Sequence, residues 1–213
     1  MSKRKIFDFL RDLRDNNDKE WFHANREAYD EAKGIWTDTV EVLLKRLAKH
    51  DDYYTSVAPN EAVERINNNL LYHPELPTYK THFGFSPGQA HGTGLYVSVY
   101  PAYSFFGAGV HNPSNEALKK IRAKIDEDGK TLQDIINAEE IQDYFGGLEE
   151  DPKALKTSPR DYSQDHEFIE LLRRKNFTVQ QRITQDDVLS DNFPEMVEEM
   201  YLKAKPLLDW LRN

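Results

Sequence analysis

The feature that most constrains the fold is an alternation of apolar and polar residues in the middle of the chain. Every second residue from Leu95 to Val99 is apolar, which is the period of a β-strand with one buried face. Pro101 follows as a turn, and residues 103–111 are then expected to form the returning strand of a hairpin. Because a hairpin joins antiparallel strands, the pattern favours an antiparallel sheet.

Helical periodicity surrounds this block. Residues 6–13 and 18–48 carry apolar residues at spacings of three and four, which predicts one short and one long helix. Asn17 with Glu20 resembles a capping box at the start of the long helix. The apolar stripe of that helix consists of Ala32, Trp36, Val40, Leu43 and Leu47. Later helices are expected at residues 112–128, 132–136, 165–174 and 191–211, the last bent or broken at Pro206.

Further strands are expected at residues 63–69, 78–85 and 177–183. Strands and helices do not alternate regularly, so the predicted fold class is α+β. It has a mostly antiparallel sheet with a hairpin, flanked by the long N-terminal helix and by C-terminal helices. A single domain is expected over residues 1–213, because the loop at residues 151–162 is too short to argue for two.

Composition excludes several classes of function. A net charge of −9 argues against a nucleic-acid partner, since such partners are bound through a basic face. The chain has no cysteine, which excludes disulfides and thiol nucleophiles and fits a reducing compartment. No signal peptide and no apolar run near the ~20 residues of a membrane span are present, so a cytoplasmic location without a membrane partner is expected. No zinc spacing or phosphate loop occurs, so neither a metal nor a cofactor is predicted.

One pair of residues has the chemistry of an anion site. Lys80 and His82 are two positions apart on an expected strand, so both side chains should point to one face of the sheet. A lysine supplies a cation, and a histidine can donate, accept or titrate near neutral pH. Together they could bind an anionic group or move a proton. The alternative is the ordinary polar face of an antiparallel sheet.

A second group lies on the returning strand of the hairpin. Gly107, Gly109 and His111 share one face, and the two glycines leave it without side chains. A strand does this where a ligand or another backbone comes close, or at a bulge. If the strands share a sheet in compatible register, Lys80, His82 and His111 should line one cleft with the glycines as its floor. Arg65 could join from a neighbouring strand.

Arg122 lies one helical turn after Leu118. Its side chain could therefore reach the sheet from the edge of the helix, or it could form a structural salt bridge.

An ordered set of residues along nearly the whole chain resembles the domain-of-unknown-function 2461 family. The matching residues at the start are Phe9, Leu10, Leu13, Asn16, Asn17, Trp21, Phe22, Asn25, Arg26 and Tyr29. Further matches are Tyr79 to His82, Ser104 to Gly109, Pro113, Leu118, Ile121, Arg122 and Ile125. The last are Pro159, Arg160, His166, Lys175 to Phe177, Pro206, Leu207 and Leu211. The resemblance implies a compact single domain in a cytoplasmic setting, and it implies no reaction.

The chain departs from the family in one charged stretch. Members typically carry Arg-Ile-x-Arg-Asp-x-Arg-Phe followed by Asp-Lys-x-Pro-Tyr-Lys. Arg65, Tyr79 and Lys80 survive here. The lost charges correspond to Asn68, Asn69, Leu71 and Leu76. The chain is thus identified as a divergent member, inactive or turned to a different ligand.

Two functions follow as hypotheses. The first is a small-molecule binding protein or enzyme with a polar cleft on the sheet face and an anionic ligand. Its candidate ligand-binding residues are Arg65, Tyr79, Lys80, His82, Gly107, Gly109, His111 and Arg122. The second is a noncatalytic protein-interaction module, favoured by the lost charges. Neither substrate, reaction, protein partner nor oligomeric state follows from the residues.

Overall fold

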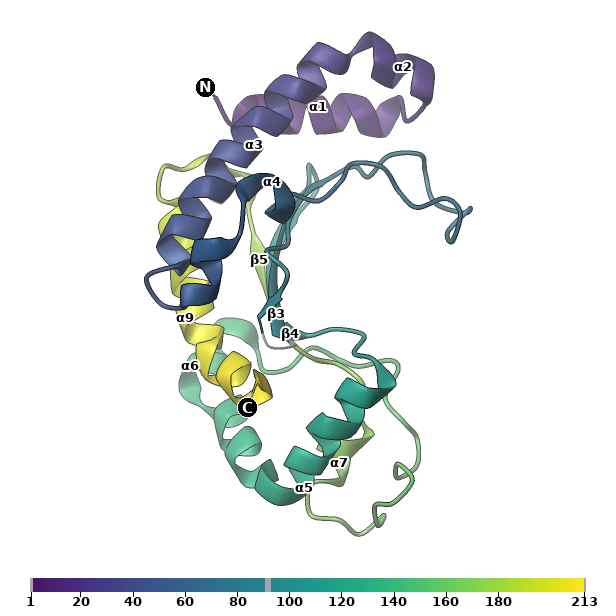
Figure 1. The fold of residues 1–213 in the computed structure, drawn as a ribbon, viewed down its shortest axis with the longest axis vertical. Coiled ribbons are helices and arrows are strands. Elements are labelled where there is room, and N and C mark those ends of the chain that lie inside the picture. Colours follow the sequence, from purple (N-terminus) through teal and green to yellow (C-terminus); the bar gives the residue numbers. More distant parts are fainter. Residues whose placement is uncertain (1, 91–92, 213) are drawn as a thin grey trace. The chain divides into compact units, whose positions relative to one another are not determined.

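The structure is a computed structural model that describes residues 2–90 and 93–212. Its N-terminal half contains α1 (Arg4–Asp15), α2 (Lys19–Ala24), α3 (Arg26–Leu47), the 3-10 turn η1 (Asp52–Ser56), α4 (Pro59–Ala62), β1 (Phe83–Phe85), β2 (Gln89–Ala90) and β3 (Thr93–Val99) (Figure 1). The remainder contains β4 (Ser104–Val110), α5 (Asn115–Asn137), α6 (Glu139–Phe145), α7 (Ile169–Arg173), β5 (Phe177–Ile183), α8 (Gln185–Leu189) and α9 (Phe193–Arg212).

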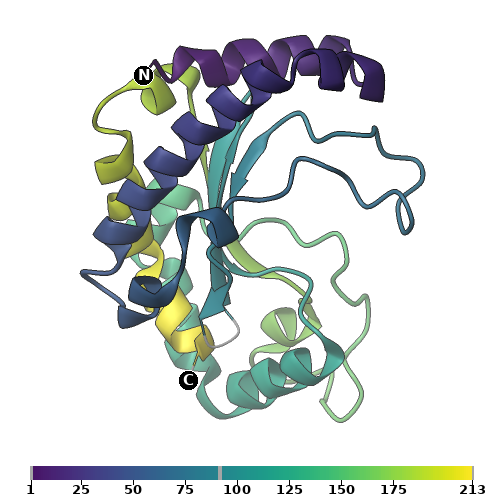
Figure 2. The same ribbon diagram turned by 45° about the horizontal axis from the view of Figure 1, so that its top comes forward.

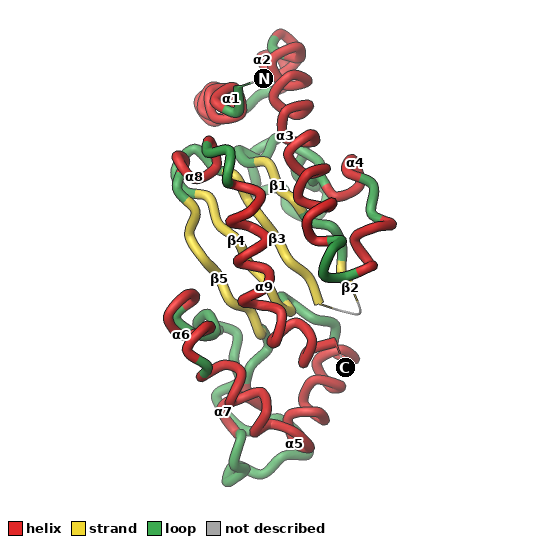
Figure 3. The backbone as a smooth tube through the Cα atoms, turned by 90° about the vertical axis from the view of Figure 1, so that its left-hand side faces the viewer, coloured by secondary structure: helices red, strands yellow, loops and turns green. Residues whose placement is uncertain are grey.

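The strands form one sheet in the order β1-β3-β4-β5, with β2 paired to β3 (Figure 3). β3 runs antiparallel to both β1 and β2, and Phe83 pairs with Val99 in the register. The predicted hairpin is confirmed, because β3 and β4 are neighbours joined by a turn at residues 100–103. The fold is therefore α+β with an antiparallel sheet, as the alternation predicted.

The contacts group the chain into two compact units. Unit 1 comprises residues 1–88, 96–106 and 182–199, and unit 2 comprises residues 89–95, 107–181 and 200–213. The division passes through β3, β4, β5 and α9. The expectation of a single domain stays a prediction.

Unit 1 is built on α3. This helix packs against α1 and β1, and its predicted apolar stripe is completely buried. At its centre Trp36 is inaccessible to solvent, and its indole nitrogen donates to the carbonyl oxygen of Gly84 at 3.2 Å. The bond joins the helix to the backbone of the edge strand β1, while the indole ring fills the core beneath it.

The predicted start of the long helix near residue 18 is confirmed, but its predicted capping residue was wrong. Asp18, not Asn17, caps α2 by accepting from the backbone N–H of Trp21. The Asn17 amide instead bonds the backbone N–H and carbonyl of Tyr79, both at 2.9 Å. The helix is also interrupted at Asn25, whose backbone N–H and side-chain amide both donate to the Trp21 carbonyl where α2 ends.

Two predicted strands are shorter than expected. Residues 63–69 and 78–85 lie antiparallel, but only Phe83–Phe85 is a regular strand. Elsewhere the two stretches meet at isolated bridges, Val63 with Phe85 and Asn67 with Tyr79. Figure 2 shows them leaving the sheet together and joining at a tip. Lys80 and His82 therefore lie on irregular backbone just before β1.

Unit 2 contains α5, α6 and α7, and both α6 and α7 pack against α5. Helix α5 has a non-helical residue at Asp128, which separates the two helical segments expected from the sequence. Gly129 follows, where a Cβ would come within 2.4 Å of the Phe168 ring. The glycine thus lets the kinked helix lie directly on that ring.

Helix α9 runs unbroken through Pro206, so of the two expected effects of this proline the break is wrong and the bend stays a prediction. A proline in a helix removes one N–H bond and presses its ring against the carbonyl four residues earlier, here that of Leu202. Both Pro206 and Leu202 are exposed, so water can solvate the freed carbonyl.

Candidate ligand site on the open face of the sheet

The alternation along β3 separates a buried face from an open one. Leu95, Val97 and Val99 are at most 3% exposed, whereas Tyr96 and Tyr100 on the other face are only half-buried. The open face of unit 1 carries two sets of side chains. The first is the Glu64 cluster, which consists of Glu64, Lys80, His82 and Tyr96. The second is the aromatic platform, which consists of Tyr100, Tyr103 and Phe105.

The Glu64 cluster is held together by one carboxylate oxygen. Glu64 Oε2 accepts from Lys80 Nζ at 3.2 Å and from the Tyr96 hydroxyl at 3.1 Å. His82 Nε2 lies 3.5 Å from the same oxygen and 3.2 Å from the Tyr96 hydroxyl. The side chains of Glu64 and Lys80 are 29% and 25% exposed, so solvent and solutes reach the ion pair.

Local backbone geometry positions the carboxylate. The N–H of Glu64 donates to the carbonyl of Gly84 at 3.0 Å, and the Glu64 side chain then crosses over that glycine. A Cβ at position 84 would lie 2.7 Å from Glu64 Oε2. The N–H of Lys80 donates to the carbonyl of Ile66 at 2.7 Å, which holds Lys80 beside the same segment. The short β1 edge and residues 64–66 thus form the frame of the cluster.

Electrostatics fix the charge states of two members. Burial by itself would raise the pKa of Glu64, but the bonds from His82, Lys80 and Tyr96 and the charge of Lys80 outweigh it and lower the pKa to about 2. Burial raises the pKa of Tyr96 well above its ordinary value, and the charge of Glu64 adds to the rise. At neutral pH the cluster therefore presents an ionised carboxylate and a protonated phenol.

The aromatic platform continues from the cluster ring by ring. The His82 ring stacks on Tyr100 with centroids 4.5 Å apart. Tyr100 stacks on Tyr103 at 5.8 Å with an interplanar angle of 14°, and Tyr103 lies 6.4 Å from Phe105. Tyr96 of the cluster lies 5.7 Å from Phe105. The rings therefore form a continuous surface bordered by the polar cluster.

A second cation borders the platform. The guanidinium of Arg182, at the end of β5, lies 5.9 Å from the centroid of the Tyr103 ring. Arg182 is exposed and Tyr103 is 50% exposed. The open face of unit 1 thus combines Lys80 and Arg182 as cations with Glu64 as the carboxylate between aromatic rings.

The Ser98 hydroxyl is buried on this face. Burial raises the pKa of Tyr96 and of Tyr100, and the nearby Ser98 hydroxyl opposes both rises. The Ser98 hydroxyl nevertheless forms no hydrogen bond within the described part of the chain.

The structure brings two of the predicted site residues together and places two others elsewhere. Lys80 and His82 meet at Glu64. Tyr79 is 4% exposed and stacks on Phe22 at 4.1 Å, so its ring belongs to the core of unit 1. Arg65 is exposed, one residue after Glu64.

The other predicted residues belong to unit 2. Gly107 is half-buried and His111 is exposed at the end of β4. Gly109 has φ +130°, and its bare face is filled by the backbone of β5 at Phe177. That Gly107, Gly109 and His111 line a cleft with Lys80 and His82 stays a prediction.

Arg122, also in unit 2, has a structural role. Its Nε donates to the carbonyl of Leu172 at 2.8 Å, and Nη2 donates to that of Arg174 at 3.4 Å. These bonds attach α5 to the end of α7.

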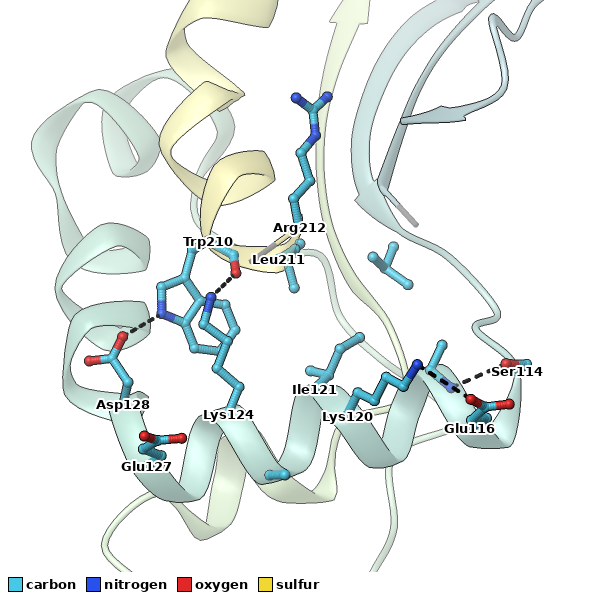
Figure 4. Close-up of a pocket in the computed structure, with 13 residues that line it drawn as sticks. Ser114, Glu116, Lys120, Ile121, Lys124, Glu127, Asp128, Trp210, Leu211 and Arg212 are labelled. Atoms are coloured by element: carbon cyan, nitrogen blue, oxygen red, sulfur yellow. Dashed lines mark hydrogen bonds and ion pairs between the residues drawn. The ribbon is translucent and has the colours of Figure 1, made fainter. Parts of the chain in front are cut away.

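Unit 2 also contains a cavity of about 1040 Å³ between α5 and the end of α9 (Figure 4). Several of its charged side chains are held by contacts within the lining. Lys120 pairs with Glu116 at 3.3 Å, and Lys124 donates to the Trp210 carbonyl and lies over its ring. Asp128 accepts from the Trp210 indole at 3.0 Å. The bonds of Lys124 and Asp128 to Trp210 join α5 to α9.

Two features are lacking within residues 2–90 and 93–212. No three side chains of the metal-ligating types gather there. No helix in this part of the chain has both the length and the apolar character needed to cross a membrane.

No direct signal in the sequence marked Glu64, Phe105 or Arg182 as site residues. Glu64 lies next to Arg65, but its reach across Gly84 depends on pairing between segments about twenty residues apart. Tyr96 and Tyr100 were recognisable as the open face of a strand, because Tyr96 occupies an alternate position of β3 and Tyr100 continues the alternation one residue beyond it.

The fold and the open face together define the class: an α+β protein whose antiparallel sheet carries a polar cluster beside stacked rings. The chain belongs to the family described as conserved hypothetical protein (DUF2461), whose sequence profile matches residues 5–210. This confirms the resemblance found in the sequence. No curated protein and no solved structure matches the chain.

Proposed function

We propose that this protein binds a small anionic ligand at the Glu64 cluster, on the open face of its sheet. The observation that carries the proposal is the convergence of Lys80 and His82 on one partly exposed carboxylate. A lysine ammonium has three donors, and its bond to Glu64 takes one of them. The donors that remain on Lys80 could bind an anionic group, although the chain as a whole has a net charge of −9.

An enzymatic role would run through His82. Its imidazole contacts the Tyr96 hydroxyl and the Glu64 carboxylate, and it stacks on Tyr100, so its orientation is set on two sides. An imidazole can act as a general acid or base toward a group within hydrogen-bond reach. Proton transfer to or from a bound ligand would therefore use this ring, with Glu64 and Tyr96 as its positioning groups.

A Lys80→Ala variant is expected to weaken the binding of inorganic phosphate about tenfold, because a charge-assisted contact contributes roughly 1.5–3 kcal/mol. Isothermal titration calorimetry would measure the change. Lys45→Ala is the matched control, since Lys45 also pairs with a glutamate but is 71% exposed on α3. Equal affinity in both variants, or no anion binding by the unmodified protein, would contradict the proposal.

We also propose a cytoplasmic location and no nucleic-acid partner. The absence of cysteine supports the first. The net charge of −9 supports the second, because phosphate backbones repel an acidic chain.

The apolar loop at residues 70–76 favours a second candidate function, a protein-interaction module. Leu71 is 83% exposed, Tyr72 is 74% exposed, and Leu70 and Leu76 are about 40% exposed (38% and 41%). The backbone is nonetheless ordered, since the N–H groups of Tyr72 and His73 both donate to the carbonyl of Asn69. Exposed apolar side chains on an ordered loop are typical of a contact surface.

This second candidate predicts a specific crosslink. A photoreactive amino acid at position 71 is expected to capture one protein in cells that the same group at position 42, where Val42 is 43% exposed, does not capture. The purified partner should then bind a Tyr72→Asp variant at least about tenfold more weakly, because aromatic anchors carry much of an interface's energy. Identical products from both positions would exclude the loop as the contact.

A further inference from the structure

We infer that the ligand of the open face is a small anion that carries a flat ring. The anionic group binds at Lys80, and the ring stacks on Tyr103 and Phe105. This inference rests on the proposed function and names the ligand class for the same site.

The first argument is the exposure of the rings. Tyr103 contacts Tyr100 and Phe105, yet half of its surface remains exposed. Ring pairs across strands stabilise a sheet by burying each other's faces. A sheet-stabilising role accounts for the ring contacts but not for the half-exposed ring of Tyr103 between Tyr100 and Phe105. An exposed ring with fixed neighbours is a ready stacking surface.

The second argument is the position of the charges. At one end of the platform, Tyr100 stacks on His82, which belongs to the cluster that holds Lys80. The planar guanidinium of Arg182 lies 5.9 Å from the centroid of Tyr103, the ring between Tyr100 and Phe105. Guanidinium groups stack on flat rings and bind carboxylates or phosphates with two parallel bonds. A ligand with a ring and an anionic group meets a matching partner at each part of this surface.

The chemistry shared by a mononucleotide and an aromatic carboxylate satisfies both arguments. Each has a planar ring at one end and an anionic group at the other. An anion without a ring uses only Lys80 and its neighbours, and a neutral ring uses only the platform. Affinity should therefore rise when both parts are present in one molecule.

The test compares adenosine 5′-monophosphate, benzoate and inorganic phosphate by calorimetry. Adenosine 5′-monophosphate or benzoate is expected to bind more tightly than phosphate. Tyr103→Ala should weaken the ring-bearing ligand about tenfold, since stacking on one ring contributes roughly 1–3 kcal/mol, and leave phosphate binding unchanged. Tyr103→Phe keeps the ring and should keep the affinity. Tyr72→Ala is the control, because Tyr72 is a 74% exposed tyrosine outside the platform.

The outcomes separate this inference from the proposed function. Suppose phosphate binding depends on Lys80, but a ring adds no affinity or Tyr103→Ala loses none. That result overturns the inference, while the proposed anion site stands. No binding of any anion overturns both. Preference for the nucleotide or for benzoate identifies the source of the ring, and either supports the inference. If a single-stranded oligonucleotide binds more tightly than these small ligands, with a steep dependence on salt, the inference of a small ligand is overturned and the partner is a nucleic acid.

Discussion

A Gly109→Ala variant is expected to lose at least about 3 kcal/mol of unfolding free energy, which for a chain of this size lowers the melting temperature by roughly 10 °C. Gly109 has φ +130°, a conformation that residues with a Cβ rarely adopt. A Cβ there would also lie 2.0 Å from the carbonyl oxygen of Phe177 and 2.9 Å from Thr178 Cα. Both obstacles are backbone atoms, so relief requires β4 and β5 to move apart.

The matched control for this experiment is Gly34→Ala. Gly34 lies inside α3, and no heavy atom comes within 4 Å of the position its Cβ would take. Alanine is favoured over glycine within a helix by about 1 kcal/mol, so this variant should be slightly more stable. Thermal unfolding followed by circular dichroism would compare the two. If the Gly109→Ala variant melted at the same temperature as the unmodified protein, the close approach of β4 and β5 would be wrong.

Acidification is expected to remove a large part of the stability of unit 1 through Glu64. The pKa of this group falls from 4.5 to about 2 on folding, so its ionised form stabilises the folded state. The contribution is complete above pH 4.5 and is lost as the pH falls toward 2. It amounts to about 3 kcal/mol at most, from roughly 1.4 kcal/mol for each pKa unit.

The corresponding variant is Glu64→Gln. It should be less stable at neutral pH, because Lys80 and His82 lose their carboxylate partner, and its stability should fall less steeply on acidification. Urea unfolding at several pH values would measure both slopes, and Glu61→Gln serves as the control because Glu61 is exposed in the neighbouring α4. Parallel pH profiles for the Glu64→Gln and unmodified proteins would show that the cluster does not stabilise the fold.

Local patterns in the sequence predicted those elements whose burial is periodic. The stripe through Trp36 and Val40 predicted most of α3, and the alternation from Leu95 to Val99 predicted β3. The same rule placed β5 at Phe177–Ile183. In each case one face of a regular element is buried, so the hydrophobic period carries the information.

The candidate site was less predictable because it depends on irregular backbone. The pairing of Lys80 with His82 was anticipated from parity on a strand, yet Lys80 lies outside β1 and reaches the site through its bond to Ile66. Glu64 contacts both only because two segments distant in sequence lie side by side. Tyr103 precedes β4, where no alternation marks it. Such contacts follow from tertiary pairing, which a local pattern does not encode.

The close approach of Glu64 to Gly84 has an evolutionary consequence. A side chain at position 84 and a carboxylate over that position compete for one volume, since a Cβ would come within 2.7 Å of the carboxylate. A single substitution at Gly84 would therefore displace Glu64 and release it from selection. Later changes at position 64 would then leave a simple reversion at position 84 without effect. The cluster can thus be lost by one substitution, but once position 64 has also changed it is regained only by two. Its loss from a lineage is therefore difficult to reverse.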